Sequence, residues 1–409
     1  MRYIADLHLH SKYSRSCSRE LTLENIDKWC QRKGINIVGT ADFTHPAWFG
    51  DIKKNLHEAE PGLYKLENGK TRFIISTEIS CIYSQGGKCR RVHICLLIPS
   101  IDSAEKIIAD FTKRGFNLKS DGRPIIGMSA KNLAKAVLDI EPRALVIPAH
   151  VWTPWFAVFG SKSGFDSLQE CFEELTPQIY AIETGLSSDP PMNWRLSALD
   201  NITLLSNSDA HSLGNLGREA NVLEIDENNL SYDEIYRIIK EKDKKKFLYT
   251  IEFFPEEGKY HVDGHADCKF SCTPEDNLEF CPTCGKKLIL GVLHRVNELA
   301  DRKNINHDKF IGYKNLIPLQ EIIADNFGVG KSSKKVLKIY YEMTDQKTEF
   351  EILIDLSEEE IKNISNSEIA RAVINVRLGK VALVPGYDGV YGKISIEKDI
   401  TSPSQDKLI

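Results

Sequence analysis

Histidine and carboxylate residues recur along the first 211 residues, each placed just after an apolar run. The hexapeptide SNSDAH, residues 206–211, has Asp209 and His211 two positions apart where one such run ends. A single pair of this kind indicates a turn more often than a metal site. The pattern is repeated, however, by His8 and His10, Asp42 and His45, Glu78, His93, His150 and Glu183. The repetition indicates that these residues form one site.

The elements that must position these residues alternate between strand and helix. Runs typical of strands are 3–9, 35–41, 73–79, 92–98, 144–148, 179–184 and 202–206. A helix is expected after the first run, from an N-cap at Thr22 to a C-terminal Gly34. The alternation predicts an α/β fold with a mainly parallel sheet, open or closed into a barrel. In a parallel barrel the carboxyl ends of the strands meet at the active site.

The residue types at these strand ends predict a metal cluster. Imidazole and carboxylate groups in this number exceed the needs of one tetrahedral zinc ion, so we expect two to three divalent ions of zinc, manganese, iron or magnesium. Glu78 or Asp209 is the expected bridging ligand. Adjacent ions activate water and neutralise the charge of a phosphate ester during hydrolysis. Phosphoryl hydrolysis is therefore the predicted chemistry, and no complete Walker loop or Gly-x-Ser-x-Gly motif indicates another.

A second metal site is predicted between residues 260 and 288. The motif Cys281-Pro-Thr-Cys284 is typical of a zinc knuckle, because the turn after the first cysteine presents both thiolates to one ion. Cys268 is the expected third ligand, and either His265 or Cys272 is the fourth. The prediction is one structural zinc ion.

Length and composition suit a cytoplasmic protein of more than one domain. The chain has 409 residues, ten cysteines and a net charge of −5, which gives no global attraction for nucleic acid but permits local basic patches. No apolar run is long enough for a membrane span and no signal peptide precedes the first strand, so we expect no membrane contact. The expected domains are a catalytic barrel (1–250), a zinc-binding element (251–300) and a small α+β C-terminal domain (301–409), helical and then mixed.

Two features of the C-terminal region have alternative interpretations. Residues 320–327 resemble a sliding-clamp peptide, but their pattern favours an amphipathic core helix. The segment PGYDGVYGK, residues 385–393, is either a tight turn or a loop in which Tyr387 and Tyr391 stack on an unpaired base.

The motifs DLHLHS (6–11) and SDAH (208–211), with the residues between them, resemble the polymerase and histidinol phosphatase (PHP) superfamily. The resemblance covers residues 1 to about 230 and implies a distorted seven-stranded barrel with up to three metal ions. Its ligand positions match His8, His10, Glu78, His93, His150, Asp209 and His211, and Asp209, Glu78 and His211 are expected to serve catalysis. Asp42 stands at a further ligand position with His45 three residues on. A ligand common after the first histidine pair is missing from residues 11–18, which leaves the third ion in doubt.

A narrower resemblance is to the endonuclease Q family. It is carried by GTADFTHPAW (39–48), AHVWTPWFAVFGSKSGFDSLQEC (149–171), ETGLSSDPPMNWRLSALD (183–200), SNSDAHSLGNLGREAN (206–221), CPTCGKKL, GVLHRVNELADR (291–302) and VPGYDGVYGK. The resemblance implies a DNA-repair nuclease that cuts 5′ to deaminated bases (uracil, hypoxanthine, xanthine) or abasic sites. The alternatives are a phosphomonoesterase of the histidinol phosphatase type and a non-catalytic nucleic-acid-binding zinc protein.

DNA contacts are expected from aromatic and basic residues near the strand ends. An extruded base would stack on aromatic side chains and phosphates would meet cations. The residues expected to do so are Trp152, Trp155, Phe156, Trp194, Arg195, Arg90, Arg91 and Lys162. Core packing and solvated surface charge are equally good explanations for them.

Overall fold

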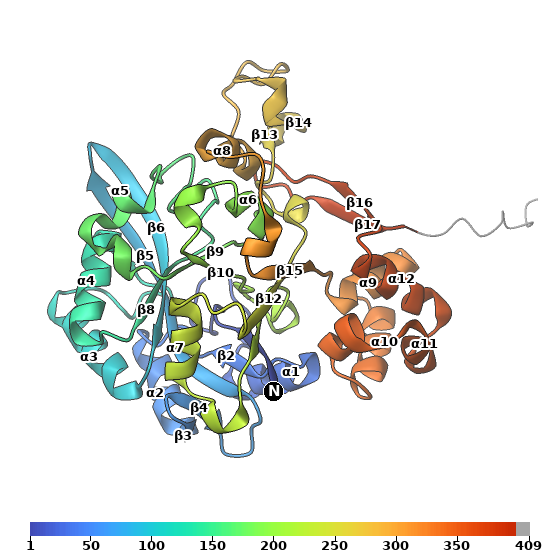
Figure 1. Cartoon of the computed structure of the whole chain (residues 1–409), viewed down its shortest axis with the longest axis horizontal. Coiled ribbons are helices and arrows are strands. Elements are labelled where there is room, and N and C mark those ends of the chain that lie inside the picture. The colour runs from blue at the N-terminus through green and yellow to red at the C-terminus, as the bar shows by residue number, and fades with distance from the viewer. Residues whose placement is uncertain (398–409) are drawn as a thin grey trace, which may run out of the picture.

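A mixed sheet forms the centre of the computed structural model, which describes residues 1–397 (Figure 1). Its strands are β1 (Arg2–Asp6), β2 (Ile37–Gly39), β3 (Leu56–Glu60), β4 (Leu63–Leu66), β5 (Arg72–Gln85), β6 (Lys88–Ile98), β7 (Ile125–Ile126), β8 (Leu145–Pro148), β11 (Ala220–Glu224), β12 (Phe247–Glu252) and β15 (Gly312–Asn315). The strands β9 (Ala181–Glu183) and β10 (Thr203–Leu205) pair with each other. Each of the seven predicted runs thus contains a strand.

The sheet is mixed rather than mainly parallel, which corrects the sequence prediction. β1, β2 and β5 are parallel neighbours, but β6 is antiparallel to both β5 and β8. The reason is the turn at Gly86 and Gly87, both with positive φ, which joins β5 to β6 as a hairpin. Strands joined by so short a turn must run antiparallel. A closed seven-stranded barrel stays a prediction.

Helices surround the sheet and form a separate group near the C-terminus (Figure 1). They are α1 (Leu23–Lys33), α2 (Pro46–Asn55), α3 (Ile101–Lys113), α4 (Ala130–Ile140), α5 (Leu168–Phe172), α6 (Pro190–Asn193), α7 (Tyr232–Lys240), α8 (Val292–Leu299), α9 (Leu319–Phe327), α10 (Lys334–Thr344), α11 (Glu358–Ile364) and α12 (Ser367–Arg377). The prediction for α1 is confirmed, since the Thr22 side chain accepts the Asn25 N–H and Gly34 has a φ of 85°. No helix within residues 1–397 is long and apolar enough to cross a membrane.

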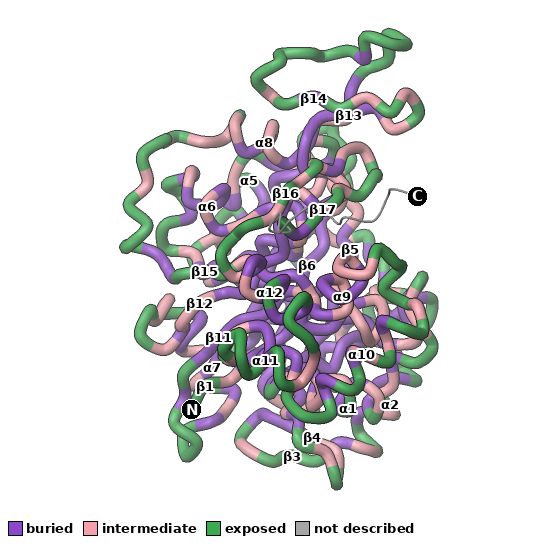
Figure 2. Tube along the Cα trace, turned by 90° about the vertical axis from the view of Figure 1, so that its right-hand side faces the viewer, coloured by how far each residue is buried: buried purple, intermediate pink, exposed green. Residues whose placement is uncertain are grey.

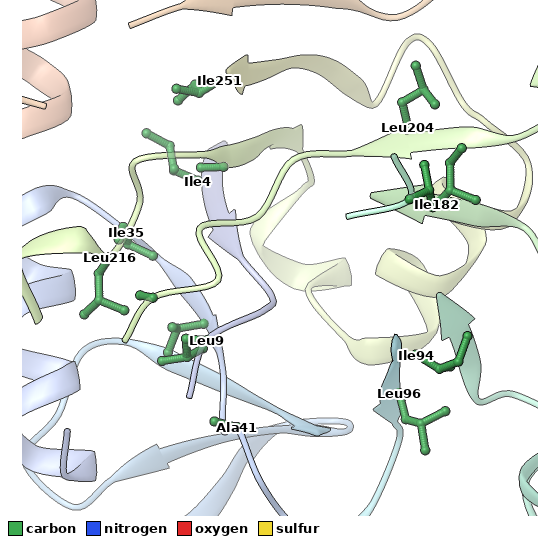
Figure 3. Close-up of a cluster of buried hydrophobic side chains, with 14 of the residues drawn as sticks. Ile4, Leu9, Ile35, Ala41, Ile94, Leu96, Ile182, Leu204, Leu216 and Ile251 are labelled. Atoms are coloured by element: carbon green, nitrogen blue, oxygen red, sulfur yellow. The ribbon is translucent and has the colours of Figure 1, made fainter. Parts of the chain in front are cut away.

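The core is continuous from the sheet to the helices that cover it. Figure 3 shows part of it, including Ile4 of β1, Ile94 and Leu96 of β6, and Ile182 of β9, all of which are buried. Figure 2 shows that burial concentrates on the strands, while the tip beyond β13 (Asp263–His265) and β14 (Phe270–Cys272) is largely exposed. The rigid sheet is therefore the support on which the polar strand ends are held.

The C-terminal region packs against the rest of the molecule through its helices and through its hairpin. The helices α9 to α12 lie beside α1 (Figure 1), where Lys33 Nζ is 2.8 Å from Glu349 Oε2, both buried. The hairpin of β16 (Val381–Val384) and β17 (Lys393–Ile396) lies above these helices. The domain boundaries stay a prediction, and residues 398–409 of the predicted last domain lie outside the described residues.

Candidate active site

The two histidines after β1 lie beside Asp209 because two distant segments pair. The chain continues extended past β1, so Leu7 and Leu9 enter the core while His8 and His10 share the opposite face. The His10 N–H donates to the Ala210 carbonyl at 3.0 Å, and the Asp209 N–H donates to the His8 carbonyl at 2.9 Å. As a result, His10 Nε2 lies 3.1 Å from Asp209 Oδ1.

Glu78 and His93 meet through the register of the β5–β6 hairpin. Glu78 pairs with Cys95 and Ser80 with His93, so Glu78 and His93 are diagonal neighbours on one face. Their side chains are 2.7 Å apart between Glu78 Oε1 and His93 Nδ1. His150, which follows β8, brings its Nε2 to 3.2 Å from the same carboxylate oxygen.

These contacts produce two sets of side chains able to hold metal ions, and a third set, His8, Cys95 and Glu183, lies beside them. The first ligand group is His8, His10, Glu78 and Asp209, and the second ligand group is Glu78, His93 and His150. Within each group the ligand atoms lie within 4.8 Å of one another. Glu78 belongs to both groups, as a bridging carboxylate would.

Unpaired buried atoms show that the site suits metal ions. His8 Nε2, His10 Nε2 and Asp209 Oδ1 are buried without a hydrogen-bond partner among the described residues. Leaving such atoms unpaired costs about 1–3 kcal/mol each. Coordination of divalent ions by these imidazole and carboxylate groups would remove that cost.

Two further carboxylates hold the histidine rings in place. Asp42 Oδ1 lies 3.2 Å from His10 Nδ1, and its other oxygen accepts hydrogen bonds from Ser11 and Ser14. Glu183 Oε2 lies 2.9 Å from His8 Nδ1. Asp42 was predicted as a ligand and Glu183 as a possible one. Both contact Nδ1 atoms and so orient the Nε2 atoms toward the centre, and Glu183 also forms a possible ligand group with His8 and Cys95.

The electrostatics of the centre keep its carboxylates ionised. Burial alone would raise the pKa of Glu78, but His93 and Arg123 hold that pKa well below its usual range. Burial likewise opposes ionisation of Asp209, and the neighbouring His10 and His8 lower its pKa. Burial is also the main cause that lowers the pKa of His93 to about 4. Burial opposes the charge of His8 and His10 as well, but neighbouring anionic groups raise the pKa of both rings well above its usual value, and bound metal ions would replace those protons.

The backbone is strained where it delivers three of the predicted residues. Asp42, His150 and Asp209 have φ angles of 41°, 30° and 45°, in the left-handed region that non-glycine residues rarely adopt. Such strain costs about 1–3 kcal/mol per residue and concentrates at functional sites. The turns that end β2, β8 and β10 thus aim these side chains at one centre.

The other two predicted histidines lie at the edge of the centre. His211 Nδ1 is 2.8 Å from the Asp209 carbonyl, and the His211 ring lies 4.7 Å from the His10 ring between centroids. His45 instead stacks on Tyr13, with ring centroids 4.4 Å apart, and neither His211 nor His45 belongs to a ligand group. His45 is therefore not brought to the centre.

Arg123 is part of the centre, and the sequence analysis missed it. Its Nη1 donates to Glu78 Oε2 at 3.0 Å. Arg123 lies in the loop before β7, outside every predicted strand and helix, and the pattern of apolar residues does not indicate a functional residue there. The pairing of β7 with β5 and the hydrogen bond from the Gly122 N–H to the Tyr13 carbonyl bring this loop to Glu78.

The centre opens into a cavity of about 1350 Å³ between the strand ends and the C-terminal region. Its cationic lining residues are Arg91, Arg123, Arg218, Lys259, Lys331 and Lys393, and its aromatic ones include Trp155, Phe156, Tyr260 and Tyr391. Trp155 and Tyr260 form an edge-to-face pair with centroids 5.6 Å apart. The cavity offers both cations for phosphates and rings for stacking, and Tyr260 was not among the predicted contacts.

Four of the predicted DNA contacts line this cavity, namely Arg91, Trp155, Phe156 and Tyr391. The structure places Trp152 and Trp194 in the core, at 1% and 4% exposure. Arg90 donates to the Gly164 carbonyl and lies over Phe165, and Arg195 donates to Asn297. Lys162 is exposed outside the cavity lining, and Tyr387 packs against Gly264. Most of the predicted DNA contacts that do not line the cavity therefore pack against other parts of the protein.

The second predicted metal site is also assembled. The ligand atoms of His265, Cys268, Cys281 and Cys284 lie within 4.8 Å of one another, whereas Cys272 is outside this group. His265 ends β13 (Asp263–His265), which pairs with β14 (Phe270–Cys272). All ten cysteines of the chain lie in the described part and are free thiols. The four-residue arrangement suits one tetrahedral zinc ion.

Known proteins resemble this chain over its whole length and over parts of it. A family model described as MJ0043 C-terminal domain matches residues 318–380. The protein MJ0043 of Methanocaldococcus jannaschii is 36% identical over 253 residues, which cover 60% of this chain and 31% of that protein. The chain thus spans about a third of the length of this relative.

Two solved structures match the whole chain. The lesion-specific endonuclease PfuEndoQ from Pyrococcus furiosus has a TM-score of 0.87 and 30% identity, covering 100% of this chain and 98% of that one. An endonuclease Q bound to a 27-mer duplex with an abasic lesion at the active site has a TM-score of 0.87 and 31% identity, covering 100% of both chains. The chain belongs to the endonuclease Q family. It is accordingly an enzyme, a hydrolase of phosphodiester bonds, and the family predicted from the sequence is confirmed.

Proposed function

We propose that this endonuclease Q family member is a metal-dependent DNA-repair nuclease that nicks DNA 5′ to deaminated bases (uracil, hypoxanthine, xanthine) or abasic sites. The observation that carries the proposal is the pair of ligand groups joined at Glu78, at the bottom of a cavity lined with cations and aromatic rings. The likeness over the full length to a lesion-specific endonuclease supports it.

The residues of the centre have distinct parts in this reaction. Two to three divalent ions held by the ligand groups, zinc, manganese or magnesium, supply an activated water and neutralise phosphate charge when bound. Glu78 and Asp209 provide the anionic ligands. Because the Nδ1 atom of His211 is engaged by the Asp209 carbonyl, Nε2 is the atom left for the ions or the phosphate.

The lesion is proposed to enter the aromatic part of the cavity. Extrusion of a base from the duplex costs about a few kcal/mol, less when the base is mispaired or missing. Trp155 and Tyr260 offer ring faces and edges for the extruded nucleotide. Lys259 Nζ lies 4.6 Å from the centre of the Tyr391 ring, so the cation and the ring can contact the phosphate and the base of one DNA strand.

The remaining parts of the proposal concern the zinc element and the partners. His265, Cys268, Cys281 and Cys284 are proposed to hold one structural zinc ion. The proposal includes no sliding clamp, because Ile322 and Ile323 of α9 are buried and not free to dock. The cytoplasmic location stays a prediction.

The test is cleavage of end-labelled duplexes that contain one uracil, one hypoxanthine, one abasic site or no lesion, with magnesium or manganese. We expect a nick on the 5′ side of each lesion and none in the intact duplex. Asp209→Asn removes one anionic ligand, so its turnover should fall by at least about 1000-fold while the affinity for lesion DNA remains.

The matched control is Asp226→Asn, which changes an exposed aspartate outside the cavity and should leave turnover unchanged. Intact DNA together with rapid hydrolysis of p-nitrophenyl phosphate would contradict the proposal and identify a phosphomonoesterase. Cleavage of all duplexes alike would show a nuclease without lesion specificity.

A further inference from the structure

Arg123 lies at the metal centre but belongs to none of the ligand groups. Its guanidinium contacts Glu78 Oε2, and the same oxygen lies 3.2 Å from His10 Nε2. Arg123 therefore touches the carboxylate shared by both ligand groups. The side chain is 26% exposed and lines the cavity, so part of the guanidinium faces the space where a substrate would enter.

The backbone on both sides of Arg123 is anchored to segments that carry the site. The Gly122 N–H donates to the Tyr13 carbonyl at 3.0 Å, three residues beyond His10. The Pro124 carbonyl accepts the Ser80 N–H at 3.0 Å, two residues beyond Glu78. The guanidinium is thus held in place by the fold.

The same loop fills the space beside Asp42. A Cβ atom at Gly122 would lie 2.2 Å from Asp42 Oδ2 and 2.3 Å from Ser14 Oγ, so only glycine fits this close approach. Asp42 Oδ2 already accepts hydrogen bonds from the Ser11 backbone, the Ser11 hydroxyl and the Ser14 hydroxyl. Asp42 consequently has neither space nor a free oxygen for an additional ion.

We propose that Arg123 is a permanent cation of this centre and that its guanidinium binds a phosphate oxygen of the DNA. The inference rests on the proposed function for its substrate. Within residues 1–397 the Arg123 side chain has one hydrogen bond, to Glu78, which leaves further N–H donors for a phosphate. An arginine suits this task because its charge is permanent and its planar fork matches two oxygens of a phosphate.

The first measurement is the binding of inorganic phosphate to the manganese-loaded full chain by isothermal titration calorimetry. Arg123→Met should bind phosphate at least about 10-fold more weakly than the wild type, with the same manganese content by mass spectrometry. Equal phosphate affinity of the two proteins would overturn the inference. This binding needs no DNA, so it decides the question even if the chain cleaves no lesion and the proposed function fails.

The second measurement uses Arg123→Met, Arg123→Lys and Arg123→Gly in the full chain. Loss of one preorganised donor lowers turnover by about 100- to 1000-fold, so this loss is expected for Arg123→Met, with its manganese content unchanged. Arg123→Lys keeps a charge and should retain more turnover than Arg123→Met. Guanidinium ion added to Arg123→Gly should restore activity, which a merely structural role would not allow.

The control is Arg114→Met, which removes an exposed arginine of the same region that pairs with Asp110. It should match the wild type in metal content and turnover. Wild-type turnover in Arg123→Met, or no rescue of Arg123→Gly by guanidinium when circular dichroism shows it folded, would overturn the inference.

Discussion

At the scale of single residues, the histidine rings of the centre depend on carboxylates that do not face the ions. Glu183 is buried and contacts His8 Nδ1, which sets the direction of Nε2. Asn207 Nδ2 in turn donates to Glu183 Oε1 at 2.8 Å. The precision of the ligand geometry therefore rests on hydrogen bonds one step removed from it.

Glu183→Gln should weaken metal binding although it removes no ligand atom of the two groups. The amide still accepts from His8 but no longer supplies negative charge, so manganese affinity is expected to fall about 10- to 100-fold. Competition with a chromogenic chelator measures this affinity. Glu105→Gln, an exposed carboxylate on α3, is the control, and equal affinity for both variants would contradict the prediction.

Sequence reasoning identified most residues of the site because they stand directly after apolar runs. Asp209, Glu78 and His150 were found in this way, and the structure brings them together. Arg123 could not be found, since its contact depends on how a loop folds onto β5. The function of Asp42 as a support for His10 also depends on distances that spacing does not give.

At the scale of elements, local signals predicted helices well and strand direction less well. The caps of α1 depend only on the residues next to its ends, Thr22 and Gly34. The bounds of this helix were therefore predicted to within one residue. The direction of β6 was missed, although Gly86-Gly87 between two apolar runs is a recognised hairpin signal. The predicted runs 73–79 and 92–98 end well before that turn, whereas the paired strands continue to Gln85 and Lys88.

β12 has a buried carboxyl group whose proton should control stability. Burial raises the pKa of Glu252 to about 8, so the folded chain keeps a proton that the unfolded chain loses above about pH 4.5. The contribution of Glu252 to the free energy of unfolding is fully present below about pH 4.5 and is lost as the pH rises toward 8. Between pH 6 and 8 the loss is about 2 kcal/mol, which Glu252→Gln should abolish.

Urea unfolding of the wild type and Glu252→Gln at pH 6, 7 and 8 measures this difference. Glutamine can still accept the hydrogen bond from Thr184, which is 3.1 Å in the wild type. Glu342→Gln, an exposed residue of α10, should change stability equally at all three pH values. A constant gap between the wild type and Glu252→Gln would show that Glu252 does not titrate in this range.

The hairpin of β13 and β14 should depend on its metal ion. Its buried apolar cluster comprises Cys272, Cys281 and Leu288, too few to stabilise a fold alone. Cys281→Ser should reduce the zinc content of the cysteine cluster from one ion to nearly none and speed hydrogen exchange in residues 263–288. Cys89→Ser, at an exposed free cysteine, should change neither, and full zinc in Cys281→Ser would contradict the assignment.

At the scale of the whole molecule, cations from separate regions line one cavity in a chain of net charge −5. Arg91 comes from β6, Lys331 from the segment before α10, and Lys393 from β17. The same lining contains five carboxylates, and Lys331 pairs with Glu321, so individual cations, and not a net positive field, are available for DNA phosphates.

Lys393→Gln should lower the salt dependence of DNA binding. If Lys393 contacts a phosphate, its loss reduces the slope of log affinity against log salt by about 1. Fluorescence anisotropy with a lesion duplex at several salt concentrations gives the slope. Lys113→Gln makes the same charge change at the end of α3, outside the cavity, and an equal change in both slopes would refute the contact.

The pairing of residues 8–10 with residues 209–210 also governs when the enzyme becomes active during its synthesis. His8 and His10 leave the ribosome first, but their partner Asp209 follows only after about two hundred further residues. Because chains emerge from the N-terminus, an incomplete chain lacks the first ligand group. A nascent chain thus cannot assemble this ligand group until Asp209 has emerged from the ribosome and folded back onto the first strand.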